Sequence, residues 1–124
     1  MTPENAATIF NVSDLASSVS YYSDVLGFKI AFQYGEFVGL EYGHVLIYLS
    51  APGHQGIKRA TGQGQLYIFC DEVDQYFQEV SAKGALVIVQ LDDRAYGMRD
   101  FGITDFDGNV LSFGMGLGPG SDKE

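Results

Sequence analysis

The sequence predicts an α+β protein in which two βαβββ modules form one domain, and three observations support this. The order strand, helix, glycine stop and further strands occurs in the first half of the chain and again in the second half. Three identities recur at a spacing of 57 residues: Asp14 and Asp71, Gly27 and Gly84, Gln33 and Gln90. Three more recur at a spacing of 65: Gly43 and Gly108, Val45 and Val110, Leu46 and Leu111. The repeat therefore predicts two similar modules, the second with a longer loop.

The first module is expected at residues 6–50. It opens with the alternating stretch TIFNV at 8–12, whose β-branched and aromatic residues predict a strand. Asp14 is a good N-cap, and apolar residues at helical spacing follow it until Gly27, which is placed to end the helix. The segments FKIAFQ, EFVGLE and HVLIYLS are separated by Tyr-Gly turns, so we expect three further strands.

The second module is expected at residues 65–114, after a glycine-rich linker at 51–64. QLYIFC predicts a strand, Asp71 is the expected N-cap of a helix that ends at Gly84, and ALVIVQ predicts the next strand. The loop DDRAYGMR, the strand DFGIT, the turn DFDGN and the strand VLSFG complete the module. The tail at 115–124 has a turn-like and charged composition, so we expect it to fray.

Composition and charge exclude several classes of protein. A chain of 124 residues with 46% hydrophobic residues is long enough for one compact domain, and its longest apolar runs are too short to cross a bilayer. The net charge of −9 disfavours nucleic acid and anionic membranes as partners and would attract a cationic ligand, although solubility alone also explains it. Cys70 is the single cysteine, so no intrachain disulfide forms and a reducing cytoplasm is expected.

Two segments resemble motifs of the vicinal oxygen chelate superfamily. DLASSVSYYSDVLGFKI is similar to its aspartate-led helix with a "vLGF" stop, and YGMRDFGITDFDGNVLSFG is similar to its closing segment with a "DPDGN" turn, except that Phe106 replaces the proline. This superfamily includes glyoxalase I, fosfomycin-resistance enzymes, extradiol dioxygenases and bleomycin-resistance proteins. The resemblance implies that each module forms a mixed sheet with one helix on its outer face, and that the two sheets curve into a shared cup.

The resemblance also implies where a metal would be held. Metal-dependent members bind a divalent ion through His, Gln and Glu side chains that face the cup. Carried over residue by residue, the four ligand positions are Ala7, Tyr48, Gln65 and Ser112. Alanine has no lone pair, protonated serine and tyrosine are poor ligands, and one glutamine carbonyl cannot hold the ion. We therefore expect no metal and no other cofactor, and we expect His44 and His54 in surface turns or loops.

Without a metal, the cup is expected to be a ligand-binding pocket. If Leu111 and Phe113 face the helix, strand alternation directs Ser112 to the cup, and the same parity applies to the other strands. Aromatic walls with polar tips suit a flat, partly polar organic ligand, although any one of these aromatic residues could instead fill a core. The candidate ligand-binding residues are Tyr48, Gln65, Tyr67, Phe69, Ser112, Arg99 and Tyr96.

Two of these candidates depend on the loop between the strands of the second module. The stretch YGMRDF places Arg99 beside the mouth of the cup, where it could stack on an aromatic ligand or bind a carboxylate. The alternative for Arg99 is a structural ion pair with one of three nearby aspartates, Asp100, Asp105 or Asp107. Tyr96 and Arg94 are candidate lid residues.

The resemblance is greatest to the antibiotic-binding resistance proteins, which lack the metal ligands, are acidic and bind a cationic aromatic ligand as dimers. We therefore expect a metal-independent small-molecule binding protein that sequesters a cationic or aromatic ligand, and a cytoplasmic homodimer. One alternative is a cofactor-free or metal-dependent lyase or isomerase of the same superfamily. A cofactor-free enzyme needs an acid and a base, for which Glu41, Asp100 and the tyrosines are the candidates. Another alternative is a non-catalytic domain of a larger assembly, with an exposed apolar patch.

Overall fold

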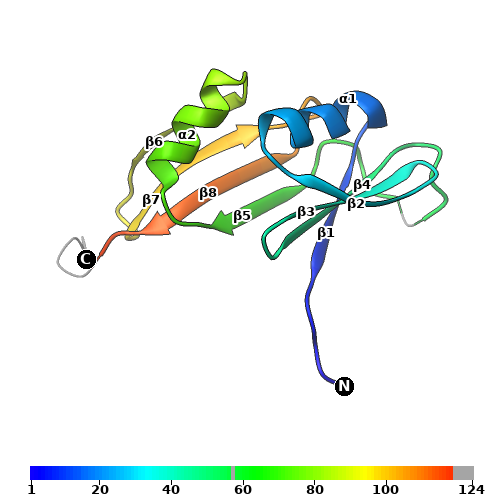
Figure 1. Ribbon diagram of the computed structural model, residues 1–124, viewed down its shortest axis with the longest axis horizontal. Coiled ribbons are helices and arrows are strands. Elements are labelled where there is room, and N and C mark those ends of the chain that lie inside the picture. The colour runs from blue at the N-terminus through cyan, green and yellow to red at the C-terminus, as the bar shows by residue number, and fades with distance from the viewer. Residues whose placement is uncertain (57, 119–124) are drawn as a thin grey trace. The chain divides into compact units, whose positions relative to one another are not determined.

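The computed structural model describes residues 1–56 and 58–118 and contains two modules of the same design (Figure 1). The first consists, in chain order, of β1 (Ala7–Asn11), α1 (Leu15–Ser20), the π-helical turn η1 (Tyr21–Val25), β2 (Lys29–Tyr34), β3 (Phe37–Tyr42) and β4 (Val45–Ser50). The second consists of β5 (Gln65–Phe69), α2 (Val73–Ala82), β6 (Leu86–Asp93), β7 (Met98–Thr104) and β8 (Val110–Gly116). The predicted α+β class with two βαβββ modules is confirmed.

The two sheets have equivalent topologies. Their strand orders are β1-β4-β3-β2 and β5-β8-β7-β6, and in each the first and last strands of the module pair in parallel while the other pairs are antiparallel. The register corrects one detail of the predicted repeat. Leu46 pairs with Ala7, the first residue of β1, whereas Leu111 pairs with Leu66, the second residue of β5. The spacing of 65 residues between these leucines is therefore not the structural equivalence.

Each helix covers one face of its own sheet (Figure 1), and the strands alternate accordingly. In β4, Ile47 and Leu49 are fully buried while Tyr48 between them is partly exposed. In the second module the rings of Phe101 and Phe113 stack with centroids 5.4 Å apart. The face of each sheet that lies opposite the helix is called its open face below. Because strand side chains alternate, every second residue of a strand lies on this face.

The helix boundaries were predicted with unequal success. The side chain of Asp14 accepts a hydrogen bond from the Ser17 amide at 3.3 Å, which confirms it as the N-cap. Gly27 has φ +90°, a conformation that glycine adopts without strain, and it follows the end of η1 as expected. The predicted N-cap Asp71 is wrong by one residue, because α2 begins at Val73 after Glu72, which has a left-handed conformation at φ 47°.

The loop predicted at DDRAYGMR is shorter in the structure. Strand β6 continues to Asp93 and β7 starts at Met98, so that Asp93 pairs with Arg99. The amide of Arg94 donates to the Met98 carbonyl at 2.7 Å and closes a tight turn. Exposed strand ends need no apolar alternation, so these polar residues do not distinguish a strand from a loop in the sequence. Strand β8 likewise reaches Gly116, two residues beyond the predicted module, and residues 119–124 of the predicted tail lie outside the described residues.

The chain divides into two compact units, and one short segment from the sequence of the second module belongs to the first unit. The first unit contains Met1–Gly64 and also the turn Asp105–Asn109; the second contains Gln65–Thr104 and the residues from Val110 onward. Within the first unit, the buried Tyr22 hydroxyl donates to Asp105 Oδ2 at 2.9 Å. Burial raises the pKa of Tyr22 well above its usual value, and the charge of Asp105 raises it further. In the described part of the chain, no helix is long and apolar enough to cross a membrane.

Candidate functional site

The open face of the second sheet carries most of the predicted ligand-binding residues. Along β5, Gln65, Tyr67 and Phe69 alternate with the core-facing Ile68, and Phe69 is 75% exposed. Ser112 of β8 is the register partner of Tyr67, and the rings of Tyr67 and Phe69 lie 5.1 Å apart. The parallel pairing of β5 with β8 thus brings four of the predicted residues onto one surface of polar and aromatic groups.

A buried carboxylate, Asp100 of β7, lies at the centre of this surface. It is 4% exposed and accepts hydrogen bonds from the Tyr67 hydroxyl at 2.8 Å, the Tyr96 hydroxyl at 2.6 Å and Arg94 Nε at 2.8 Å. Burial alone would raise the pKa of Asp100, but the hydrogen bonds from Tyr96, Arg94 and Tyr67 outweigh it and hold the pKa below its usual value. Burial, followed by the bond to Asp100, raises the pKa of Tyr67.

These protonation states decide what the Asp100 cluster can do chemically. Asp100 is a carboxylate at neutral pH, its oxygens already accept three side-chain donors, and its lowered pKa makes it a weak base. Tyr67 is a protonated phenol that donates its hydrogen to Asp100. The cluster therefore provides a fixed polar floor rather than a proton-transfer pair. Sequence reasoning named Asp100 as a catalytic candidate and missed its role in orienting Tyr67 and Tyr96.

Gly114 of β8 makes this arrangement possible, and its replacement gives a test. A Cβ atom at Gly114 would overlap the Tyr67 hydroxyl and lie 2.9 Å from Asp100 Cβ, so Gly114→Ala is expected to displace Tyr67. We expect the free energy of unfolding to fall by about 1 to 3 kcal/mol, measured by urea denaturation. Gly102→Ala is the matched control, because its Cβ would make an ordinary 3.4 Å contact with Val89. Equal losses in the two variants would contradict this role of Gly114.

The predicted lid residues belong to the same cluster. Tyr96 lies in the turn between β6 and β7, and although its side chain is 67% exposed, its hydroxyl is bound to Asp100. Arg94, at the start of that turn, forms an ion pair with Asp100. The turn is thus attached to the open face through one carboxylate. Its movement as a lid stays a prediction.

Arg99 does not join the open face. Its guanidinium forms a two-bond ion pair with Asp74 of α2, at 2.8 and 3.0 Å, and a third bond with Asp93 at 3.0 Å. Because Asp74 belongs to the helix, Arg99 points to the helix side of β7, opposite to its neighbour Asp100. The ion-pair alternative is therefore what the structure contains, but the three aspartates predicted as partners were wrong.

The open face of the first sheet carries Tyr48 in an aromatic group. The Tyr48 ring lies 5.1 Å from that of Phe32 and 5.5 Å from that of Phe37, and His54 stacks on Phe37 at 4.4 Å. Phe32 fits over Gly39, where a Cβ atom would overlap its ring. His54 follows β4 in the predicted linker, so its contact with Phe37 had no signal in the sequence. We refer to Phe32, Phe37, Tyr48 and His54 as the aromatic group.

The comparison with known proteins identifies the family. The sequence matches the profile of the glyoxalase/bleomycin resistance protein/dioxygenase superfamily over residues 6–113. The chain belongs to this superfamily. This result agrees with the resemblance carried by the aspartate-led helix and the DFDGN turn.

Three similar proteins share between 20% and 26% sequence identity with this chain. The bleomycin resistance protein of Geobacillus stearothermophilus is 26% identical over an alignment of 117 residues, and the match covers 82% of this chain and 89% of that protein. TnmS3, an antibiotic binding protein from Streptomyces sp. CB03234, is 20% identical with a TM-score of 0.77, covering 93% of this chain and 97% of the other. Lactoylglutathione lyase from Agrobacterium tumefaciens is 25% identical with a TM-score of 0.74, covering 93% and 96%. The fold therefore occurs in proteins with different names and activities.

The four positions that the resemblance predicts as metal ligands carry side chains that do not suit a metal ion. Ala7 and Gln65 are the first residues of β1 and β5, while Tyr48 and Ser112 pair with the third residues of those strands, so the four positions are equivalent in the two modules. Their side chains supply one amide and two hydroxyl groups. Across residues 1–56 and 58–118, no three His, Cys, Asp or Glu side chains are grouped so that they could hold a metal ion. This donor set does not suit a divalent ion.

Proposed function

We propose that this protein is a metal-independent binding protein of the glyoxalase/bleomycin resistance type that sequesters a cationic or aromatic, antibiotic-like small molecule. The observation that carries the proposal is the replacement of potential metal ligands by Ala7, Tyr48, Gln65 and Ser112 on open faces that also bear aromatic rings. Flat aromatic surfaces with a few oriented polar groups bind planar organic molecules. The names of the bleomycin resistance protein and of TnmS3 support a ligand of this class.

The charge of the protein supports a cationic ligand. The chain carries 16 acidic and 7 basic residues, and a negative surface raises the association rate of a cation at low salt. Raising the ionic strength is therefore expected to weaken binding. The charge of Asp100 does not add to this attraction, because Arg94 forms an ion pair with it.

A cytoplasmic homodimer is part of the proposal. Strands β2 and β6 each lie at one edge of their sheet, and they carry exposed apolar side chains, among them Ile30, Tyr34 and Ile88. Apolar edge strands associate readily with a second copy of the chain. Cys70 is the single cysteine of the sequence, so no disulfide forms within the chain, which suits a reducing compartment.

Thermal unfolding of the chelator-treated protein with bleomycin tests the proposal. Ligand at 100 times its dissociation constant adds about 2.7 kcal/mol, which is a rise of several degrees in Tm for a chain of this size. Tyr48→Ala and Gln65→Ala are expected to weaken binding at least about tenfold, because each removes an open-face contact. The control Gln78→Ala lies on the exposed surface of α2 and is expected to change nothing.

Two results would count against this function. If Tyr48→Ala and Gln65→Ala leave the affinity for bleomycin, for a mitomycin-type drug and for S-substituted glutathiones unchanged, the open faces are not the binding site. If divalent metals alone raise the Tm of the chelator-treated protein, the assignment of the ligand positions is wrong and an enzymatic reaction must be sought.

A further inference from the structure

The open faces of the two sheets can be compared row by row, because their registers match. One row across the first sheet consists of Phe32, Gly39, Tyr48 and Ile9. The row at the same place in the second sheet consists of Val89, Gly102, Ser112 and Tyr67. In both sheets the edge strand has one extra residue just before this row, Ala31 in β2 and Ile88 in β6, which supports the alignment. We call these the first-sheet row and the second-sheet row.

Aromatic rings fill the first-sheet row. The ring of Phe32 lies against Gly39, where a Cβ atom would overlap it. The rings of Phe32 and Tyr48 are 5.1 Å apart. A glycine inside a strand weakens the strand and often marks the close approach of another group. In the first sheet, the group that approaches the glycine is a ring of the protein itself.

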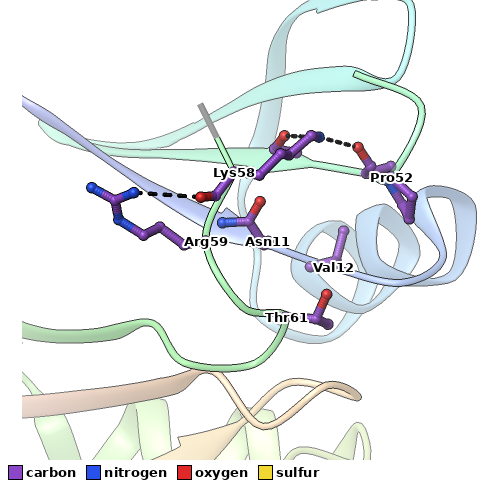
Figure 2. A pocket seen from close by; sticks show the side chains of 8 residues that line it. Asn11, Val12, Pro52, Lys58, Arg59 and Thr61 are labelled. Carbon is purple, nitrogen blue, oxygen red and sulfur yellow. Dashed lines mark hydrogen bonds between the residues drawn. The ribbon is translucent and has the colours of Figure 1, made fainter. Parts of the chain in front are cut away.

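The first unit has a cavity, and it lies outside the first-sheet row (Figure 2). The cavity has a volume of about 270 Å³, and its lining includes Asn11 and Ser50, the last residues of β1 and β4. Phe32, Gly39 and Tyr48 do not line it. This cavity is therefore separate from the row that the rings occupy.

Smaller side chains stand in the second-sheet row. Val89 takes the place of Phe32, and Ser112 takes the place of Tyr48. Val89 is 44% exposed and Ser112 is partly exposed, so a ligand can reach both. Gly102 is buried, and a Cβ atom there would lie 3.4 Å from Val89 and 3.7 Å from Ser112 Oγ. The second sheet thus keeps the glycine of this row without an aromatic ring against it.

Tyr67 borders the second-sheet row with a ring that is already fixed. Its hydroxyl donates to Asp100 at 2.8 Å and lies where a Cβ atom of Gly114 would be, so the ring leans toward Gly114 and away from Ser112. A ligand that stacks on this ring does not have to order it first, which lowers the entropy cost of binding. Phe69 is 75% exposed, and its ring lies 5.1 Å from that of Tyr67. The two rings form an aromatic surface beside the row.

We propose that the second-sheet row binds a planar aromatic ring of the ligand, which lies against Val89 and beside Tyr67 as Phe32 lies beside Tyr48 in the first sheet. The Ser112 hydroxyl supplies a hydrogen bond to a polar substituent of that ring. Stacking on a fixed ring provides the main attraction. This inference rests on the proposed function, and it names the group of the ligand that the open face of the second sheet holds.

The test rebuilds the first-sheet arrangement in the second sheet. Val89→Phe and Ser112→Tyr each add the ring that the first sheet has at the same place. Calorimetric titration of the full chain then measures the affinity for bleomycin and for proflavine, a planar aromatic cation. Each variant is expected to weaken binding at least about tenfold, because the added ring occupies the place of the ligand's ring. Val89→Phe is expected to leave the Tm of the free protein unchanged, since Val89 is exposed and Gly102 matches Gly39.

Further variants separate the loss of space from other effects. Gln78→Phe adds a ring on the exposed surface of α2 and is expected to change neither affinity. Ser112→Ala removes the hydroxyl but leaves room for a ring, so it is expected to weaken binding less than Ser112→Tyr; the opposite order would overturn the proposal. Unchanged affinities in both Val89→Phe and Ser112→Tyr would overturn it and leave the proposed function intact. If the unaltered protein binds neither bleomycin nor proflavine, both proposals are wrong.

Discussion

Asp105→Ala is expected to lower the free energy of unfolding by about 3 to 5 kcal/mol, because it leaves several buried donors without an acceptor. Asp105 is 2% exposed. Its Oδ1 accepts the amides of Asp107, Gly108 and Asn109 at 2.9 to 3.0 Å, and its Oδ2 accepts the Tyr22 hydroxyl and the Asn109 side-chain amide at 2.9 Å. One carboxylate thus fixes the turn and ties it to the core of the first unit.

Urea denaturation at neutral pH measures this loss. Tyr22→Phe removes a single donor and keeps the ring, so it is expected to cost about 1 kcal/mol. Asp24→Ala, an exposed aspartate of η1, is the matched control and is expected to change stability by less than about 0.5 kcal/mol. If Asp105→Ala costs no more than Asp24→Ala, the carboxylate does not hold the turn.

Asp100→Ala is expected to cost about 2 to 3 kcal/mol at neutral pH, since it removes the shared acceptor of Tyr67, Tyr96 and Arg94. Arg94 is partly exposed, so water can solvate its charge when Asp100 is removed. The loss of stability is therefore expected to stay below that of Asp105→Ala. The phenol of Tyr67 would lose the partner that fixes its orientation on the open face. Weaker binding of the ligand by Asp100→Ala is expected for the same reason.

The pH dependence of stability gives this prediction a second measurement. The pKa of Asp100 is lowered in the folded state, so the stability it contributes is present above the unfolded pKa of about 3.9 and is lost as the pH falls through the folded value. Urea denaturation followed between pH 7 and pH 3 should therefore show a smaller acid-induced loss in Asp100→Ala than in the unaltered protein. Asp71→Ala, exposed and in the same module, is expected to retain the full loss. Identical acid profiles for Asp100→Ala and the unaltered protein would falsify this assignment.

Alternation and capping made most of the fold predictable. In VLIYLS the buried Ile47 and Leu49 lie two residues apart, with the partly exposed Tyr48 between them. Gly27 has the positive φ at which the first helix ends. The change from α1 to the π-helical η1 had no local signal, because Val19, Tyr22 and Leu26 have the spacing of an ordinary α-helix. The start of α2 at Val73 depends on the left-handed Glu72, a conformation that propensity disfavours and that tertiary structure imposes.

The site was less predictable, because it depends on register. Parity along β5 and β8 placed Gln65 and Ser112 on the open face correctly once the core side was chosen. Strand β6, by contrast, shifts register between Val87 and Val89 and again before Asp92, which sets Asp93 opposite Arg99. Bulges of this kind change which residues lie opposite each other, and no particular residue type marks them in this sequence. The partners of Arg99 therefore could not be predicted from the sequence.

The turn Asp105–Asn109 also has a consequence for the order in which the chain can fold. It completes the first unit through a bond between Tyr22 and Asp105, 83 positions apart, and another between Asn11 and Asn109, 98 positions apart. The first 64 residues are therefore synthesised before the turn that completes their unit. Contacts of such long range slow folding. The nascent first module must wait, incompletely closed, until residues 105–109 have been synthesised.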